Sequence, residues 1–144
     1  DPEMSRGLGD VYKRQVYCLY RGKDQESILM QKNACHDFAE KKGWNIVGEE
    51  QEIGVSGYKV STDDLVKLKR IRKAAEQGEF DILLVFMYDR LGRNLNETPF
   101  IAEWFTKKGI HVWSVYEGEI IDGVDAERML DYIRFWQTDE AQKL

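Results

Sequence analysis

The stretch FDILLVFMY, residues 80–88, is the feature that most constrains the fold of this chain. Its apolar residues follow one another instead of alternating with polar ones, so a strand formed here has both of its faces buried. Strands of this kind occur in parallel sheets whose two faces are covered by helices. The run therefore predicts a central strand of an α/β domain.

Strand-like and helix-like patterns alternate on both sides of this run. The helix-like segments have apolar residues three and four apart, and they end near Gly43, Gly78 and Gly109. Strand and helix in alternation is the repeating unit of a mainly parallel α/β sheet. We expect strands at 16–20, 44–50, 80–88 and 110–116, and helices at 27–42, 62–77 (capped by Thr62 or Asp63), 99–108 and from 124 onward.

Residues 1–15, DPEMSRGLGDVYKRQ, show neither a helical nor a strand period. We interpret them as a leader that arose as an expression or assembly artefact, or else as a disordered native tail, and we leave them out of the fold in either case. Residues 16–144 have the length of one domain, and 42% of the chain is hydrophobic, which is enough for one core.

The charge and hydropathy of the chain exclude two classes of protein. A net charge of −5 and a pI near 5.1 do not fit a free-standing, strongly basic nucleic-acid binder. Any contact with DNA must therefore be local, or must use a basic segment outside this chain. No apolar run approaches the ~20 residues that a membrane-spanning helix needs. We expect a cytoplasmic protein without membrane contact.

The cysteines and histidines do not form a metal-binding pattern. Cys18 and Cys35 are far apart, with no C-x-x-C spacing, which favours two small buried hydrophobic side chains over a disulfide or a metal site. His36 and His111 are each isolated. We therefore expect no bound metal.

Charged residues follow the apolar run directly, in the order Asp89, Arg90 and Arg93. Ligands of open α/β sheets bind beyond the carboxyl ends of the strands, which is where these residues fall. If a helical turn begins at Leu91, the two arginines lie on one side and form a permanently charged receptor for a phosphate group. The alternative is an Asp–Arg ion pair on a surface loop, and the spacing alone does not decide between them.

Several motifs along residues 16–144 resemble one family. DRLGRN at 89–94 resembles the Asp-Arg-Leu-x-Arg signature of the serine site-specific recombinases, the resolvase and invertase family. SILMQ at 27–31, GVSG at 54–57 and KKGIHVWSVYEGEI at 107–120 are similar to further family motifs in the same order. MLDYIRFWQTDEAQK at 129–143 is similar to the start of the family's long dimerisation helix. The chain looks most like the large serine recombinases of Firmicutes mobile elements.

This resemblance implies a resolvase-like catalytic domain at 16–144, without the C-terminal DNA-binding region of the family. The family cleaves and exchanges DNA strands through a phosphoserine link and uses no metal or other cofactor. By motif match, Arg90 and Arg93 stabilise the transition state, Asp89 supports them or handles a proton, and Gln31 helps to hold the site together. DNA is then a partner, bound weakly by this chain alone, and Arg21, Arg90 and Arg93 are its phosphate-binding residues.

The resemblance also implies a homodimer or tetramer that assembles through the C-terminal helix. An apolar stripe runs along that predicted helix, and a short helix at a chain end can bury such a stripe only in part. Packing of the helix back onto its own domain is the alternative. The stripe consists of Met129, Tyr132, Ile133 and Trp136.

The chain departs from the family at the nucleophile. The family has Tyr-x-Arg-x-Ser at the end of its first strand, but this chain reads VYCLYRGKDQES at residues 16–27. Anchored on LYR, the motif makes Arg21 the family arginine and reduces the following Val-Ser-Thr to Gly22 and Lys23. Anchored on Gln25, it places Arg21 at the serine position. The nucleophilic serine is absent in both registers.

The nearby hydroxyl and acidic groups favour structural roles. Ser27 falls in the first turn of the helix at 27–42, where we expect it to cap the helix and not to act as a nucleophile. Ser56 matches the loop motif and is expected to shape that loop. Where the family usually has an arginine before the next helix, this chain has Thr62, Asp63 and Asp64, whose carboxylates repel DNA.

Two functions remain open from the sequence. One is a serine recombinase catalytic domain with a damaged active site, and the other is a non-enzymatic, resolvase-like module for dimerisation or regulation. A nucleotide-binding domain is a weaker third possibility, because no Gly-x-Gly-x-x-Gly or Walker sequence follows a predicted strand.

Overall fold

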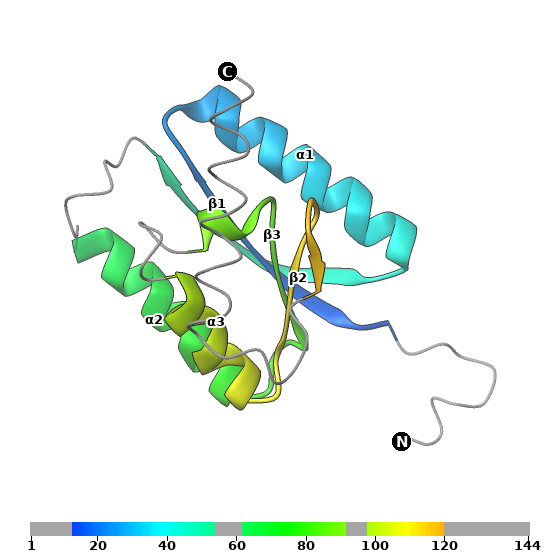
Figure 1. Cartoon of the computed structure of the whole chain (residues 1–144), viewed down its shortest axis with the longest axis vertical. Coiled ribbons are helices and arrows are strands. Elements are labelled where there is room, and N and C mark those ends of the chain that lie inside the picture. The colour runs from blue at the N-terminus through cyan, green and yellow to red at the C-terminus, as the bar shows by residue number, and fades with distance from the viewer. Residues whose placement is uncertain (1–12, 54–61, 92–97, 120–144) are drawn as a thin grey trace.

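The computed structural model describes residues 13–53, 62–91 and 98–119, with side chains in the second range from residue 67. Strands and helices alternate along these ranges, as the sequence predicts (Figure 1). The elements are β1 (Gln15–Gly22), α1 (Gln25–Lys42), β2 (Asn45–Ile53), α2 (Thr62–Glu76), β3 (Ile82–Val85), the 3-10 turn η2 (Tyr88–Arg90), α3 (Thr98–Lys107), β4 (His111–Ser114) and β5 (Gly118–Glu119).

One five-stranded sheet in the order β2-β1-β3-β4-β5 organises these elements. The pairs β2–β1, β1–β3 and β3–β4 are parallel, and the short β5 pairs antiparallel with β4. Parallel strands direct their carboxyl ends to the same edge of the sheet, so β1, β2, β3 and β4 all end there. The expected mainly parallel α/β fold is confirmed.

The central strand β3 is buried on both faces, as its apolar run predicts. Leu83 and Val85 pack into one core cluster and Ile82 and Leu84 into another, and all four side chains are fully buried. The cluster of Leu83 faces α2 and α3, while that of Leu84 faces α1, so helices cover both faces of the sheet (Figure 1).

Two strands are shorter than the sequence predicts. β3 covers Ile82–Val85 and not 80–88, because the chain turns after Val85 and forms η2 at Tyr88–Arg90. β4 ends at Ser114 because the next residues form the turn into β5, where Gly118 has a φ of 95°, in the region that favours glycine. Apolar composition continues through both turns, so it does not mark where the strands end.

Helix α1 begins earlier than expected, and its cap is a different residue. Asp24 is the N-cap, and its carboxylate accepts a hydrogen bond from the Ser27 backbone N–H at 2.8 Å. The prediction that Ser27 caps this helix is therefore wrong, because Ser27 is the third residue inside it. Gly43 closes the helix with a φ of 75°, as expected.

The cysteines are free and buried, which confirms their expected hydrophobic role. Cys18 and Cys35 pack between β1 and α1. Hydrogen bonding to Cys18 and burial raise the pKa of the Cys35 thiol far above its ordinary value, so the thiol stays protonated.

The ends of the described chain bear on the domain boundary that the sequence predicts. β1 begins at Gln15, one residue before the boundary expected for the domain, because the Gln15 N–H donates to the Asp81 carboxylate at 2.9 Å. Residues 1–12 of the predicted leader (1–15) and the predicted C-terminal helix from 124 onward lie outside the described residues. Among the residues that are described, none belongs to a helix long and apolar enough to span a membrane.

Candidate active site

The carboxyl edge of the sheet brings the predicted site segments together. β1 and β3 are paired from Val16 with Ile82 to Leu19 with Val85. β1 and η2 are in contact at this edge. The end of β1 and the turn after β3 therefore lie next to each other at this edge of the sheet.

Gln31 holds the backbone of Arg21 at the end of β1. Its side chain is fully buried, and its Nε2 donates to the Arg21 carbonyl at 2.5 Å while its Oε1 accepts from the Arg21 N–H at 3.2 Å. The Nε2 also lies 3.3 Å from the Ser27 hydroxyl. A buried amide is stable only when its polar atoms are paired, and here the strand end supplies the partners. Gln31 thus joins α1 to the site.

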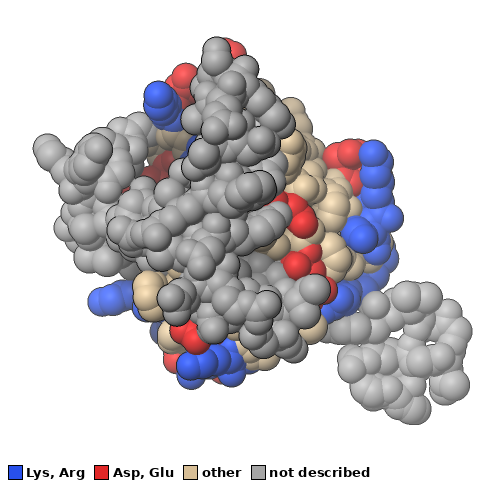
Figure 2. Space-filling model, viewed as in Figure 1, with Lys and Arg blue, Asp and Glu red and all other residues tan. Residues whose placement is uncertain are grey.

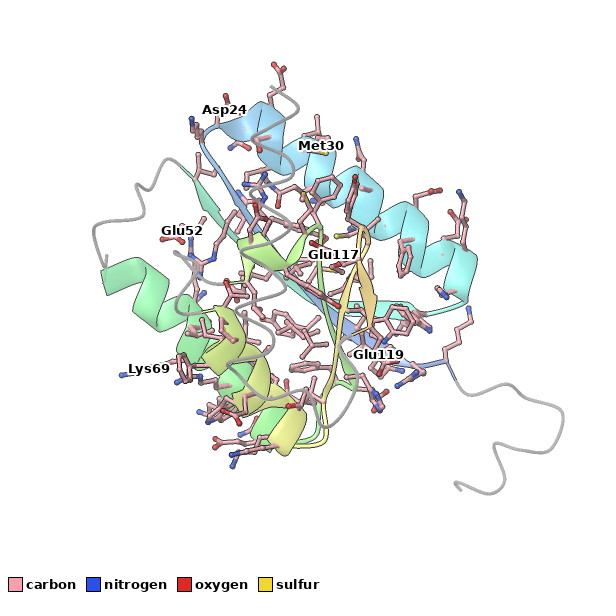
Figure 3. All side chains as sticks on the ribbon, viewed as in Figure 1. Asp24, Met30, Glu52, Lys69, Glu117 and Glu119 are labelled. Atoms are coloured by element: carbon pink, nitrogen blue, oxygen red, sulfur yellow. The ribbon has the colours of Figure 1, made fainter. Side chains whose placement is uncertain are left out.

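The Arg21 side chain forms an ion pair with Glu52, which sequence reasoning missed. Its Nη1 donates to the Glu52 carboxylate, and both side chains are nearly buried, with exposures of 11% and 5%. The two residues are directly paired across β1 and β2, and Figure 3 shows Glu52 at the end of β2. Opposite charges at directly paired positions of neighbouring strands indicate such a contact. This indication can be used only once the register of β1 with β2 is known.

Gly22 leaves no room for a side chain. A Cβ built on Gly22 would lie 2.6 Å from the Ser27 hydroxyl oxygen and 2.9 Å from the Ser27 Cβ, with the Gln31 amide at 3.3 Å. The residue that ends β1 is therefore packed directly against the first turn of α1. A serine placed at residue 22 would displace Ser27 instead of presenting a free hydroxyl.

Asp89 and Arg90 lie side by side in η2 and are each about one-third exposed. The Arg90 Nε is 3.5 Å from the Asp89 Oδ1. Both atoms are buried, yet within the described residues neither has a hydrogen-bond partner. Buried polar atoms of this kind are uncommon in folded proteins. The Nε is a donor that an anion oxygen could pair with, so η2 fits an anion-binding role.

Burial raises the pKa of Asp89 above the ordinary value of 3.8, although the positive charge of Arg90 lowers it in part. A carboxyl group with a raised pKa exchanges its proton more readily near neutral pH. The proton-handling role expected for Asp89 agrees with this direction.

The remaining predicted residues lie outside the description. Arg93 and Ser56 fall in undescribed ranges, so their places relative to Arg21 and Arg90 stay predictions. Thr62, Asp63 and Asp64 begin α2, but their side chains are not described. Within residues 13–53, 67–91 and 98–119, no group of three or more His, Cys, Asp or Glu side chains is arranged to hold a metal ion.

Comparisons with known proteins agree with this fold. The family model described as "Resolvase, N terminal domain" matches residues 21–140. The chain therefore belongs to the resolvase N-terminal domain family, whose members are DNA recombinases. A search of curated proteins found no match.

Solved structures show the same fold. The N-terminal catalytic domain of TP901-1 integrase has a TM-score of 0.66 and 25% identity, over 88% of this chain and 98% of that chain. A resolvase family site-specific recombinase from Streptococcus pneumoniae has a TM-score of 0.65 and 22% identity, over 90% and 91%. The catalytic domain of ISC1926 TnpA, an IS607-like serine recombinase, has a TM-score of 0.60 and 21% identity, over 90% and 84%. The fold is that of a serine recombinase catalytic domain.

Replacement of Asp89 by asparagine is expected to change how stability depends on pH. Because the folded-state pKa is raised, the folded protein binds this proton more tightly than the unfolded chain. The stability that Asp89 contributes is therefore greatest at low pH and falls as the pH rises through the raised pKa. Asparagine does not titrate, so the free energy of unfolding of Asp89→Asn should improve relative to the parent as the pH rises.

Urea denaturation of both proteins between about pH 4 and about pH 7 measures this difference. Asp37→Asn, on the exposed face of α1, is the control for loss of one carboxylate. A difference between parent and Asp89→Asn that stays constant with pH would contradict the assignment.

Proposed function

We propose that this chain is the catalytic domain of a DNA serine recombinase that has kept its phosphate-binding site and lost its nucleophile. The site residues are Arg21, Gln31, Asp89, Arg90 and Arg93. One observation carries the loss: the connection between β1 and α1 consists of Lys23 and Asp24, so it contains no hydroxyl group. The expected position of the serine, around Arg21 and Gly22, has none either.

The missing reaction requires a serine oxygen to attack a DNA phosphorus atom. A phosphoserine bond forms, the bond to the leaving 3′ oxygen breaks, and that oxygen takes up a proton. The covalent link conserves the phosphodiester energy for rejoining. Gly22 has no side chain to form it, and Lys23 carries a strongly hydrated ammonium group that attacks phosphate poorly. Asp24 is engaged as the cap of α1.

The arginines would supply charge stabilisation in this reaction. Negative charge builds up on the phosphate oxygens in the transition state, and preorganised donors aimed at them lower the barrier. The position of Arg90 at the carboxyl edge supports such a role, as does its buried Nε, which has no hydrogen-bond partner among the described residues. Arg21 can bind phosphate only if the Glu52 carboxylate shares or releases its guanidinium. We infer that Glu52 limits access of DNA to Arg21.

The unmodified chain is expected to form no covalent adduct with DNA. A nicked, end-labelled duplex is incubated with the protein and resolved on a denaturing gel. A version with Val-Ser-Thr in place of Gly22 and Lys23 has a loop one residue longer, so its residue 22 need not keep the backbone position in which a side chain meets Ser27. It should recover some adduct, because Gln31, Asp89 and Arg90 remain. Asp63 and Asp64 are expected to keep the yield low.

Two controls make this experiment specific. Val-Ala-Thr at the same place has the same loop length without the hydroxyl and should give no adduct. Gly22→Ser should also fail, because the new side chain meets Ser27. An adduct from the unmodified chain would contradict the proposed inactivity, and its loss in Ser27→Ala would identify Ser27 as the nucleophile. No adduct from the Val-Ser-Thr version would contradict the claim that the rest of the site is intact.

DNA binding by this chain is expected to be weak and to fall steeply with salt. The net charge of −5 opposes binding, and acidic and basic side chains are interspersed over the described surface in Figure 2. Few phosphates can then be contacted, and their contacts are screened by ions. Fluorescence anisotropy of a short duplex over a range of salt concentrations measures the slope, which Arg90→Ala should reduce by about 1.

Arg70→Ala is the matched control, since this exposed arginine on α2 pairs with Glu50 away from η2. An equal effect of both variants would contradict a specific role for Arg90. Tight, sequence-specific binding at physiological salt would contradict the local character of the contact.

We further propose that the chain self-associates through its C-terminal helix as a dimer or tetramer, in the cytoplasm. The apolar stripe of Met129, Tyr132, Ile133 and Trp136 and the family membership support this assembly. A module that lost its chemistry could still dimerise and so regulate active recombinases, which is the second function. Ile133→Asp should shift the light-scattering mass toward the monomer, and a monomeric parent at high concentration would contradict the proposal.

A further inference from the structure

The point where β4 leaves the sheet has a role that neither the motif match nor the family assigns. Beyond the last paired residues, two further backbone hydrogen bonds continue the β3–β4 ladder. The Val115 N–H donates to the Val85 carbonyl at 2.9 Å, and the Tyr116 N–H donates to the Phe86 carbonyl at 3.2 Å. The chain then turns toward β5, away from the residues that follow β3.

The Glu117 side chain supplies the next acceptor. Its Oε1 accepts a hydrogen bond from the Tyr88 backbone N–H at 3.1 Å. The Tyr88 hydroxyl in turn donates to the Gly118 carbonyl at 2.5 Å. Tyr88 is buried, so its N–H needs a partner within the protein. The first residue of η2 is thus attached at two points to the turn between β4 and β5.

Ser114 fixes the position of this carboxylate. Ser114 is fully buried, and its hydroxyl donates to the Glu117 Oε1 at 2.5 Å. The Ser114 hydroxyl oxygen also accepts a hydrogen bond from the Glu117 N–H at 2.7 Å. Figure 3 labels Glu117 near the centre of the view, with Glu119 farther along the β4–β5 hairpin. The Glu117 side chain is therefore braced before it meets Tyr88.

We propose that Glu117 is a positioning residue for the site, because it holds the turn that carries Asp89 and Arg90 against the β4–β5 hairpin. Asp89 and Arg90 follow Tyr88 directly, and the turn closes on itself through the Arg90 N–H to the Met87 carbonyl and the Leu91 N–H to the Tyr88 carbonyl. A shift of Tyr88 therefore moves both charged side chains. Only the consequence for phosphate binding rests on the proposed function; the contact itself does not.

The electrostatics of the carboxylate agree with a structural use of its charge. Burial raises the pKa of Glu117, the hydrogen bonds from Ser114 and Tyr88 lower it, and the nearby charge of Asp89 raises it further. Two donors converge on one carboxylate oxygen, so much of its negative charge is compensated within the protein. Glu117 can therefore stand next to an anion site without closing it to phosphate.

Amide hydrogen exchange measured by NMR tests the contact. In Glu117→Ala the Tyr88 N–H loses its acceptor and should exchange about tenfold faster, the change expected for loss of a hydrogen bond to a charged acceptor. Glu117→Gln keeps an oxygen in the same place and should retain most of the protection. The amides of Leu84 and Val112, in the sheet core, report any general loss of stability and should exchange at the parent rate.

Glu119→Gln is the matched control, because Glu119 lies on the same hairpin but contacts His111, at 2.8 Å, and not η2. It should leave the exchange rate of Tyr88 unchanged. Ser114→Ala removes the brace and provides a second route to the same loosening if Glu117→Ala does not fold. Unchanged Tyr88 exchange in Glu117→Ala, or equal acceleration at Leu84, would overturn the positioning role.

Titration with inorganic phosphate separates this role from the proposed function. The Arg90 Nε–Hε signal should shift on addition of phosphate, with an affinity several-fold lower in Glu117→Ala and restored in Glu117→Gln. An Arg90 signal that ignores phosphate in the parent would overturn phosphate binding at η2, whereas the exchange result would still decide the positioning role. Accelerated Tyr88 exchange with unchanged phosphate affinity would overturn the inference that Glu117 positions Arg90.

Discussion

A single buried amide, that of Gln31, joins the helix α1 to the end of β1. Burial of an amide without partners costs several kcal/mol, on the order of 1–3 from protein mutations. Gln31 avoids this cost only if the Arg21 backbone lies where it does. The position of Arg21, the close packing of Gly22 on Ser27 and the start of α1 at Asp24 are therefore set together. The first half of the site depends on this interaction.

The end of β1 and the turn η2 are both held by a side chain that hydrogen-bonds to their backbone. A strand that ends inside a sheet leaves backbone groups without a neighbouring strand, and these groups must be paired. Gln31 pairs the last residues of β1 from a helix, and Glu117 pairs the first residue of η2 from a hairpin turn. Side chains thus take the place of strand partners where the ladder stops. The site can lie at an edge and still be rigid.

The sequence predicts the order and type of the elements because these follow from short-range patterns. The apolar run of β3 and the helical stripes of α1 and α3 each reflect burial against the layer next to them. Element ends are decided by individual hydrogen bonds, which composition does not encode. Ser27 was a plausible cap by residue type, but Asp24 lies where the carboxylate can reach the Ser27 N–H. β3 ends early for a similar reason, since η2 forms within an apolar stretch.

The sequence predicts those site residues that belong to a local motif or directly follow a recognisable strand. Asp89 and Arg90 adjoin a recognisable strand, and Gln31 falls in a motif, so all three residues could be named from the sequence. Glu52 and Glu117 act across strand neighbours that are distant in sequence, and their roles require the register of β1 with β2 and the path of β4 into β5. Only the SVYE part of the motif at 107–120 hinted at Glu117, without indicating a contact to Tyr88.

The proposed loss of the nucleophile is compatible with an intact fold because the reacting group and the supporting groups would be different residues. A catalytic hydroxyl must be free to reach a phosphate, so it contributes little to packing. Arg21 is different, since its nearly buried guanidinium is paired with Glu52, and breaking a buried pair by removing one partner costs about 3–5 kcal/mol. Arg21 therefore contributes to the stability of the fold whether or not the chain cleaves DNA. Its presence follows from packing and charge pairing, whereas catalysis would require a free hydroxyl after β1.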